Sequence, residues 1–493
     1  MIELQQPLSN FMSLGGDQRQ VAHPDTGLTK YRTTLGPREG VPFGSCTASW
    51  PSLRAWRAAD AQLTAWRGAT DSDAAVSETA GLVRQRLAAA MGLGQGRGVV
   101  LAPSGTDAIY LVSALALRGA DTVHHVVVGA SELGGGTVRA SSGLAFSSCT
   151  PHAGDVQVGE TVEGLHGRTT AEPVYLRDEL GERLEPEEVD ALVMDKVTAA
   201  VSAGHRVVVH LVAHSKTGLR APSLSVADDL VERFGDRVVI MVDAAQGRVA
   251  LRDVRAALER GFQVLFTGSK FYSGPPFSGV LFLPNQDDPG VLPAGLNAWF
   301  ARSDLPQTWH EARSGLTVDH NPGLLLRWVS ALAVLEAYHA IPSRVRGRIY
   351  HTFAGAVMEA FGPSPYLEVD VPMPPVHRLV TGLGAYPTVF GFRVLEGRRH
   401  LSTAELKRLH TLLDSNLGEQ DERLETQLYL GQPVALGRPR PDAPALLRVA
   451  LGARLVIELS RSPDAGGAWL RDRLGQVRTQ IQTLVQAGLH RAP

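Results

Sequence analysis

Short runs of apolar residues recur through the middle of the chain and alternate with segments of helical periodicity. Several runs are nearly continuous in Val, Ile and Leu, which is typical of strands that are covered on both faces. Helical patterns such as "DAIYLVSALALRG" and "SVADDLVERFG" lie between them. This alternation predicts an α/β domain with a largely parallel sheet. The predicted strands are residues 98–102, 124–130, 206–214, 237–244, 262–268 and 278–284.

The segments on either side of this region have different patterns. Residues 1–75 are polar and interrupted by Gly and Pro, with one expected helix in "PSLRAWRAADAQLTAW", and we interpret them as an N-terminal arm. A helix in "SETAGLVRQRLAAAMGL" should begin at Ser77 and end at Gly92. The stretch 151–200 resembles an insertion, polar at first and then helical.

The pattern changes again near residue 325, where a long helix is followed by an α+β mixture. The segments "TVFGFRVL" and "LLRVALGARLVIEL" are predicted as strands of this part. We therefore predict three parts: an arm (1–75), a large α/β domain (76–325) and a smaller α+β domain (326–493).

Composition and charge exclude several function classes. Of the 493 residues 44% are hydrophobic and 20% charged, which is an ordinary globular composition, and the formal net charge of -2 gives no reason to expect nucleic acid as a partner. No apolar run approaches the length of a membrane span, and the first residues lack the pattern of a signal peptide. The two cysteines, Cys46 and Cys149, are too few for a disulfide framework or a Cys-rich metal site. We expect a cytoplasmic protein with neither a membrane partner nor a metal.

Candidate chemistry lies at the ends of the predicted strands, where open α/β sheets bind their ligands. Ser104, Gly105 and Thr106 follow a strand and open a helix, so free backbone amides and a hydroxyl converge on a site that suits a phosphate. The alternative is that Ser104 only caps the helix and Gly105 only makes a tight turn.

Two further strand ends carry charged residues. Asp243 ends a strongly apolar run, and it either caps the next helix or needs a cationic partner, because an unpaired buried carboxylate is costly. Gln246 follows three residues later. Lys270 ends another apolar run, beside Thr267 and Ser269. A lysine in such a dry site has a lowered pKa and becomes a nucleophile toward carbonyl groups.

An anion site, a carboxylate and a lysine in this order are what pyridoxal phosphate requires, for its phosphate, its ring nitrogen and its aldehyde respectively. The motifs "SGTDA", "DAAQ" and "TGSKFYSGPPFSG" resemble those of fold type I pyridoxal-phosphate enzymes, aspartate aminotransferase-like in fold, and specifically the aminotransferase class V group that includes cysteine desulfurases. The resemblance covers roughly residues 75–460 and implies these roles: an imine with Lys270, Asp243 on the ring nitrogen, Gln246 and Ser215 near the ring hydroxyl, and phosphate contacts from Ser104, Gly105, Thr106, Thr267 and Ser269.

Two more segments extend the resemblance. "RSGLT" resembles a segment whose threonine, here Thr317, reaches the phosphate of the partner subunit, which implies a homodimer with composite active sites. "LLRVALGARL" resembles the strand whose arginine, here Arg448, binds the α-carboxylate of an amino-acid substrate. The sequence also departs from the family: Glu132 or Leu133 falls where a His or an aromatic residue usually covers the ring, and Lys216 stands where an acidic residue is common.

The resemblance implies an enzyme that acts on an amino acid through a lysine imine and a quinonoid, with an aminotransferase as the first hypothesis. A lyase that eliminates or cleaves at Cβ or Cγ is the alternative. A desulfurase is less favoured, because the segment "LGQPVALGRPRPDAPALL" contains no cysteine. A catalytically inactive binding protein on this fold is disfavoured by the presence of both Asp243 and Lys270, and a dehydrogenase by the lack of a glycine fingerprint after a strand.

Overall fold

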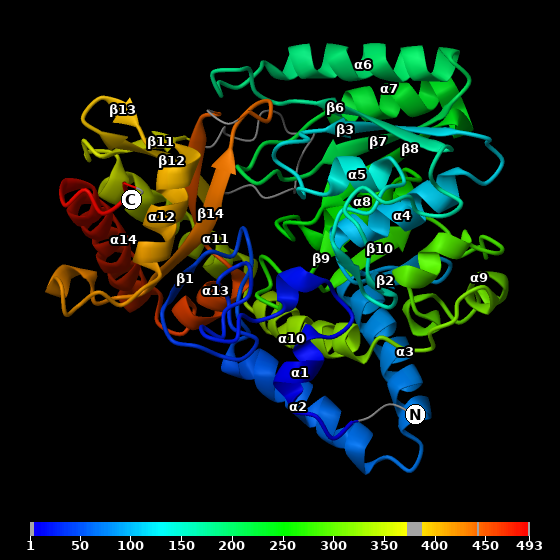
Figure 1. The fold of residues 1–493 in the computed structure, drawn as a ribbon, viewed down its shortest axis with the longest axis horizontal. Helices are drawn as coiled ribbons and strands as arrows, with labels where there is room; N and C mark the ends of the chain where they lie inside the picture. Colours follow the sequence, from blue (N-terminus) through cyan, green and yellow to red (C-terminus); the bar gives the residue numbers. More distant parts are fainter. Residues whose placement is uncertain (1–3, 372–386, 441–442, 492–493) are drawn as a thin grey trace.

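A sheet of seven strands forms the centre of the larger part of the molecule (Figure 1). The computed structural model describes residues 4–371, 387–440 and 443–491. The strand order is β2-β10-β9-β8-β7-β3-β6, and only β10 runs antiparallel to its neighbours. The strands are β2 (Gly98–Ala102), β3 (Val123–Val128), β6 (Thr169–Val174), β7 (Arg206–Val212), β8 (Val238–Ala244), β9 (Gln263–Thr267) and β10 (Gly279–Leu283). The predicted α/β domain with a mostly parallel sheet is confirmed.

The apolar runs are continuous because both faces of this sheet are buried. In β9, Val264 and Phe266 pack into one hydrophobic core, whereas Leu265 between them packs into a second core on the opposite face. Strand β10 alternates in the same way. Successive side chains of a strand point to opposite faces, so a strand between two layers of helices needs apolar residues at every position.

Helices supply both covering layers. The first core contains residues of α3 (Ser72–Met91), α6 (Pro186–Ser202), α7 (Leu224–Phe234), α8 (Leu251–Glu259) and α10 (Pro322–His339), and the second contains α4 (Gly105–Ala116) and part of α5 (Thr137–Ser141). Helix α3 begins five residues before the predicted start, because the side chain of Asp71, and not Ser77, accepts a hydrogen bond from an amide of its first turn. Its end at Gly92, with φ +64°, is as predicted.

One strand of the sheet was not predicted. Strand β6, with the sequence "TTAEPV", pairs only with β3 and forms the edge of the sheet. Three of its six residues are half-buried and one is exposed, and Pro173, which has no amide hydrogen, is tolerated at an edge. An edge strand that is partly exposed has no continuous apolar run for a sequence pattern to detect.

The second sheet has the order β1-β14-β15-β12-β11, with β13 paired to β12 (Figure 1). Its strands are β1 (Val41–Phe43), β11 (Leu367–Asp370), β12 (Val389–Glu396), β13 (Arg399–His400), β14 (Leu428–Ala435) and β15 (Ala445–Ala450), and the helices of this part are α11 (Ser343–Phe361), α12 (Thr403–Leu413), α13 (Ala453–Leu459) and α14 (Pro463–Gln486). Strand β1 comes from the N-terminal arm and pairs parallel with β14. The predicted boundaries at residues 75 and 325 fall inside α3 and α10 and stay predictions.

The segment "LLRVALGARLVIEL" is only half strand. The prediction is confirmed for β15 but wrong for "ARLVIEL", which forms helix α13. Leu455, Val456 and Leu459 of α13 are buried together. Their spacing of three and four residues is the helical period, which the high content of branched residues obscured.

The N-terminal arm packs against α10 through α1 (Leu8–Ser13) and α2 (Leu53–Gly68). The fully buried Arg327 of α10 donates hydrogen bonds to the carbonyls of Met12, Leu14 and Gly15 in the arm, and to that of Phe277 in the loop after Lys270. Within the described ranges no single helix is long and apolar enough to cross a membrane, although the bent pair α10 and α11 reaches that length and composition together.

Candidate functional site

A cavity of about 270 Å³ lies where the first turn of α4, the ends of β8 and β9, the N-terminal arm and strands β14 and β15 meet. Eight of the predicted site residues line it: Ser104, Gly105, Thr106, Asp243, Thr267, Ser269, Lys270 and Arg448. They come from segments far apart in the sequence and from both sheets. Ser215, Gln246 and Thr317 are not among the lining residues.

Lys270 is a half-buried amine that follows strand β9. None of the described residues accepts a hydrogen bond from its Nζ or forms an ion pair with it. Burial lowers the pKa of Lys270 to about 8, although Asp243 opposes this shift, and Arg448 lowers the pKa further. About a tenth of the amine is therefore uncharged at pH 7, far more than for an ordinary lysine, and this uncharged form is the nucleophile.

Asp243 ends strand β8 and is 6% exposed. Its Oδ1 accepts a hydrogen bond from the amide of Ala245 at 3.0 Å, and no Lys, Arg or His of the described residues forms an ion pair with it. Burial raises the pKa of Asp243, while the Ala245 amide and Lys270 act in the opposite direction. Asp243 does not cap the next helix, because α8 begins after Ala250. A buried carboxylate without a cation at a cavity wall fits a ligand that carries a protonated nitrogen.

The N-terminus of α4 offers free backbone amides to the cavity. Ser104 caps the helix: its Oγ accepts a hydrogen bond from the amide of Asp107 and donates one to the carboxylate of Asp107 at 2.5 Å. The amides of Gly105 and Thr106 have no acceptor among the residues that the structure describes. A Cβ on Gly105 would come within 2.9 Å of Leu265. The tight turn and the two amides suit an oxyanion.

The hydroxyls beside Lys270 are linked to one another. Thr267 donates a hydrogen bond from Oγ1 to the carbonyl of Ala245 at 2.6 Å and accepts one from the Oγ of Ser269 at 3.3 Å. The hydrogen bond that Ser269 donates is long and weak, so Ser269 can donate to an incoming anion instead more easily than Thr267 can.

The three predicted residues outside the cavity lining have other partners. Ser215 donates a hydrogen bond to the carboxylate of Glu132 at 2.5 Å. Gln246 donates from Nε2 to the carbonyl of Cys46 at 3.1 Å, and its Oε1 is buried without a partner. Thr317 is exposed, and its amide donates to the side chain of Asn297.

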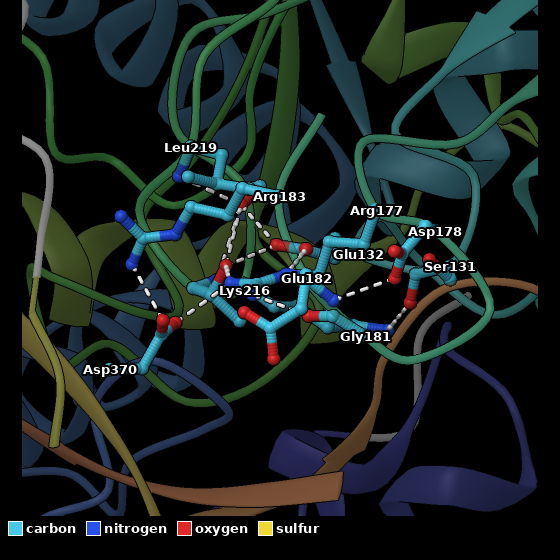
Figure 2. A network of polar contacts seen from close by, with 12 residues as sticks. Ser131, Glu132, Arg177, Asp178, Gly181, Glu182, Arg183, Lys216, Leu219 and Asp370 are labelled. Carbon is cyan, nitrogen blue, oxygen red and sulfur yellow. Dashed lines mark hydrogen bonds and ion pairs between the residues drawn. The ribbon is translucent and has the colours of Figure 1, made fainter. Parts of the chain in front are cut away.

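Glu132 is buried in a network of charged residues that no sequence pattern predicted (Figure 2). Its carboxylate accepts hydrogen bonds from Arg177 at 2.9 Å, from Ser215 and from Thr217. Arg177 also forms an ion pair with Asp370 of β11 at 2.7 Å, so the network connects the two sheets. Glu132 is not among the residues that line the cavity, whereas Gly134 and Gly135 of the same turn are.

Arg448 lies on β15 and is 2% exposed. Its terminal nitrogens donate to the hydroxyl of Thr47 and the carbonyl of Gln432, both at 2.8 Å, and to the carbonyls of Lys216 at 3.1 Å and Cys46 at 3.4 Å. Its Nε is buried without a partner. Arg448 therefore holds the arm, the turn after β7 and β14 together at the cavity wall, and its guanidinium is not paired with any described acid.

Several lining residues were not predicted. Arg19 and Cys46 come from the arm, Gln432 lies in β14, and Lys216 follows β7. Arg19 forms an ion pair with Asp17 at 2.6 Å. Nothing in the local sequence of the arm distinguishes Arg19 from the chain's many surface arginines, because it reaches the cavity only through tertiary packing.

The comparisons with known proteins place the fold. No family model matches the chain, and no curated protein matches it. A solved NifS-like protein is 12% identical and aligns over 90% of this chain and 100% of its own, with a TM-score of 0.53. The Escherichia coli cysteine desulfurase CsdA is 15% identical over 87% of this chain and 94% of its own (TM-score 0.50), and the Oryza sativa TDC, solved with PLP, is 16% identical over 88% and 82% (TM-score 0.50). The fold is that of the fold type I pyridoxal-phosphate enzymes, as the sequence motifs predict.

Proposed function

We propose that this protein is a pyridoxal-phosphate-dependent enzyme that acts on an amino acid. The observation that carries this proposal is the meeting, in one cavity, of an unpaired amine on Lys270 and an unpaired carboxylate on Asp243, beside the free amides of α4. Among the residues that the structure describes, none of these groups has the partner that pyridoxal phosphate would supply. The buried, unsatisfied Oε1 of Gln246 and the shared fold support the same assignment.

Each residue of the site has a proposed role. When bound, pyridoxal phosphate would supply the electron sink for charge that develops at the substrate Cα. The amides of Gly105 and Thr106 and the hydroxyl of Ser269 would hold the phosphate. Asp243 would hold a proton on the ring nitrogen, and Lys270 would anchor the aldehyde carbon and then take the Cα proton as a base, which its lowered pKa permits.

For the reaction itself we propose transamination, because it requires no group beyond a lysine base and a carboxylate on the ring nitrogen. A lyase would use the same two residues and differ in which bond of the substrate breaks. Incubating the holoenzyme with single amino acids, and assaying keto acid, ammonia and pyridoxamine phosphate, separates the two. Pyridoxamine phosphate formed with a keto acid supports transamination, whereas ammonia without pyridoxamine phosphate supports a lyase.

Arg448 is proposed to bind the α-carboxylate of the substrate, which would replace the 3.4 Å bond to the Cys46 carbonyl. An Arg448→Lys variant should retain the cofactor but bind amino acids about tenfold or more weakly, since a lysine cannot make two parallel hydrogen bonds to a carboxylate. Titration of cofactor absorbance with amino acids and with simple amines measures the effect. Equal weakening of amines, which have no carboxylate, would identify Arg448 as purely structural.

We also propose a homodimer in which Thr317 contacts the phosphate of the partner subunit. The exposure of Thr317 in the single chain is compatible with this role. If the sites are shared, cofactor binding and dimerisation are linked by mass action. Sedimentation should then find more dimer with the cofactor than without it, and a stable monomer with full cofactor occupancy would contradict the proposal.

A further inference from the structure

We propose that the substrate carries a second anionic group besides its α-carboxylate, and that Lys216 is the residue that recognises it. This inference rests on the proposed function and names the substrate class of the same site. It stands on the position of Lys216 in the cavity wall, on the absence of a counterion for it among the described residues, and on the commitments of the other charged residues around it.

The backbone fixes Lys216 at the wall of the cavity. Its amide donates to the carbonyl of Glu132 at 3.0 Å, and its carbonyl accepts a hydrogen bond from Arg448 at 3.1 Å. Its Nζ makes one long hydrogen bond, to the carbonyl of Ser131 at 3.3 Å. Lys216 lines the same cavity as Lys270, so two of the five lysines in the chain meet at one site.

The acids near Lys216 are already neutralised (Figure 2). Glu132 forms an ion pair with Arg177 at 2.9 Å and accepts hydrogen bonds from two hydroxyls. Asp370 pairs with Arg177 at 2.7 Å and with Arg183 at 2.8 Å. In the described part of the chain no carboxylate forms an ion pair with Lys216, which leaves a half-buried ammonium without a counterion.

The remaining charges of the cavity have partners or assigned roles. Arg19 is paired with Asp17. In the proposed function the cofactor would contact Lys270 and Asp243, and the substrate α-carboxylate would pair with Arg448. Burial, Arg448 and Lys270 lower the pKa of Lys216 to about 8, and Glu132 opposes this shift. In most molecules the Lys216 amine is therefore still protonated at pH 7. A cation in such a position is stabilised when a ligand brings an anion to it.

Equilibrium binding to the holoenzyme tests the inference. The probes are L-aspartate, L-glutamate and O-phospho-L-serine. Each is compared with the amino acid that has the corresponding uncharged side chain, which is L-asparagine, L-glutamine or L-serine. The readout is the change in cofactor absorbance. We expect the wild-type protein to bind at least one anionic probe about tenfold or more tightly than its counterpart. Lys216→Met should remove that preference while leaving binding of the uncharged amino acids within a few-fold, and Lys216→Arg should retain part of it.

A matched control is Lys196→Met, because Lys196 pairs with Glu172 away from the cavity and should leave the preference intact. Equal weakening of anionic and uncharged probes in Lys216→Met would overturn the inference, since Lys216 would then serve the α-carboxylate. A wild-type protein without any preference for the anionic probes would overturn it even if the variant does not fold. Failure of the protein to attach pyridoxal phosphate at Lys270 would instead refute the proposed function.

Discussion

Replacing Lys270 with alanine is expected to remove covalent attachment of pyridoxal phosphate and to lower turnover by roughly 10²–10⁴-fold or more, the range that a positioned acid–base group contributes. The loss should exceed that of any other lysine variant, because Lys270 is proposed to be both the anchor and the base. Its Nζ has no partner among the described residues, so the substitution breaks no hydrogen bond, and the variant should keep a melting temperature close to that of the cofactor-free wild-type protein.

Borohydride reduction followed by peptide mass spectrometry checks the anchor directly. The reduced cofactor should be found on the peptide that contains Lys270, in the wild-type protein and in a Lys216→Ala variant alike. A label on Lys216 in the wild-type protein would contradict the assignment. Lys216 is the alternative to test, because both lysines line the cavity and burial lowers the pKa of each to about 8.

The pH dependence of attachment gives a second measurement on Lys270. Only the uncharged amine attacks an aldehyde, and the pKa of Lys270 in the protein without ligand is lowered from 10.5 to about 8. The rate at which added pyridoxal phosphate attaches should therefore rise with pH and level off above about pH 8. A rate that continues to rise toward pH 10 would indicate a lysine exposed to solvent.

The residues proposed to be catalytic could be predicted from the sequence because each belongs to a local pattern. Asp243 lies at the end of one buried strand and Lys270 follows another, and the ends of neighbouring parallel strands meet at one edge of a sheet. Ser104, Gly105 and Thr106 could be predicted for the same reason, because they join a strand to the first turn of a helix. The structure brings these residues to a single cavity.

The remaining residues are brought to the site by tertiary packing, which has no local pattern. Arg177 lies just after an edge strand that itself escaped prediction, and its partners Glu132 and Asp370 come from the turn after β3 and from the second sheet. Arg19 lies in an arm of weak periodicity. The role proposed for Thr317 requires a second subunit. Such contacts between distant segments decide which cations remain free at the cavity, and therefore which substrate fits.

Replacing Asp243 with asparagine should separate binding of the cofactor from its activation. The amide is nearly the same size and can still accept a hydrogen bond from the Ala245 amide, so the turn after β8 should persist and the cofactor should be retained. The lost charge would no longer keep the ring nitrogen protonated. We expect turnover to fall by about 10²-fold or more, the cost of removing a preorganised electrostatic group. Asp304→Asn, a substitution of a buried aspartate that does not line the cavity, is the matched control.

The same variant predicts a change that a purely structural role for Asp243 would not cause. Asp243 raises the pKa of Lys270, opposing the effect of burial, so the asparagine variant should lower that pKa further. Attachment of pyridoxal phosphate to the cofactor-free variant should therefore level off at a lower pH than in the wild-type protein, even though later turnover is slower. Faster attachment near neutral pH together with slower catalysis would be the signature of the lost charge. Near-normal turnover with an unshifted attachment profile would show that Asp243 serves only the turn at the end of β8.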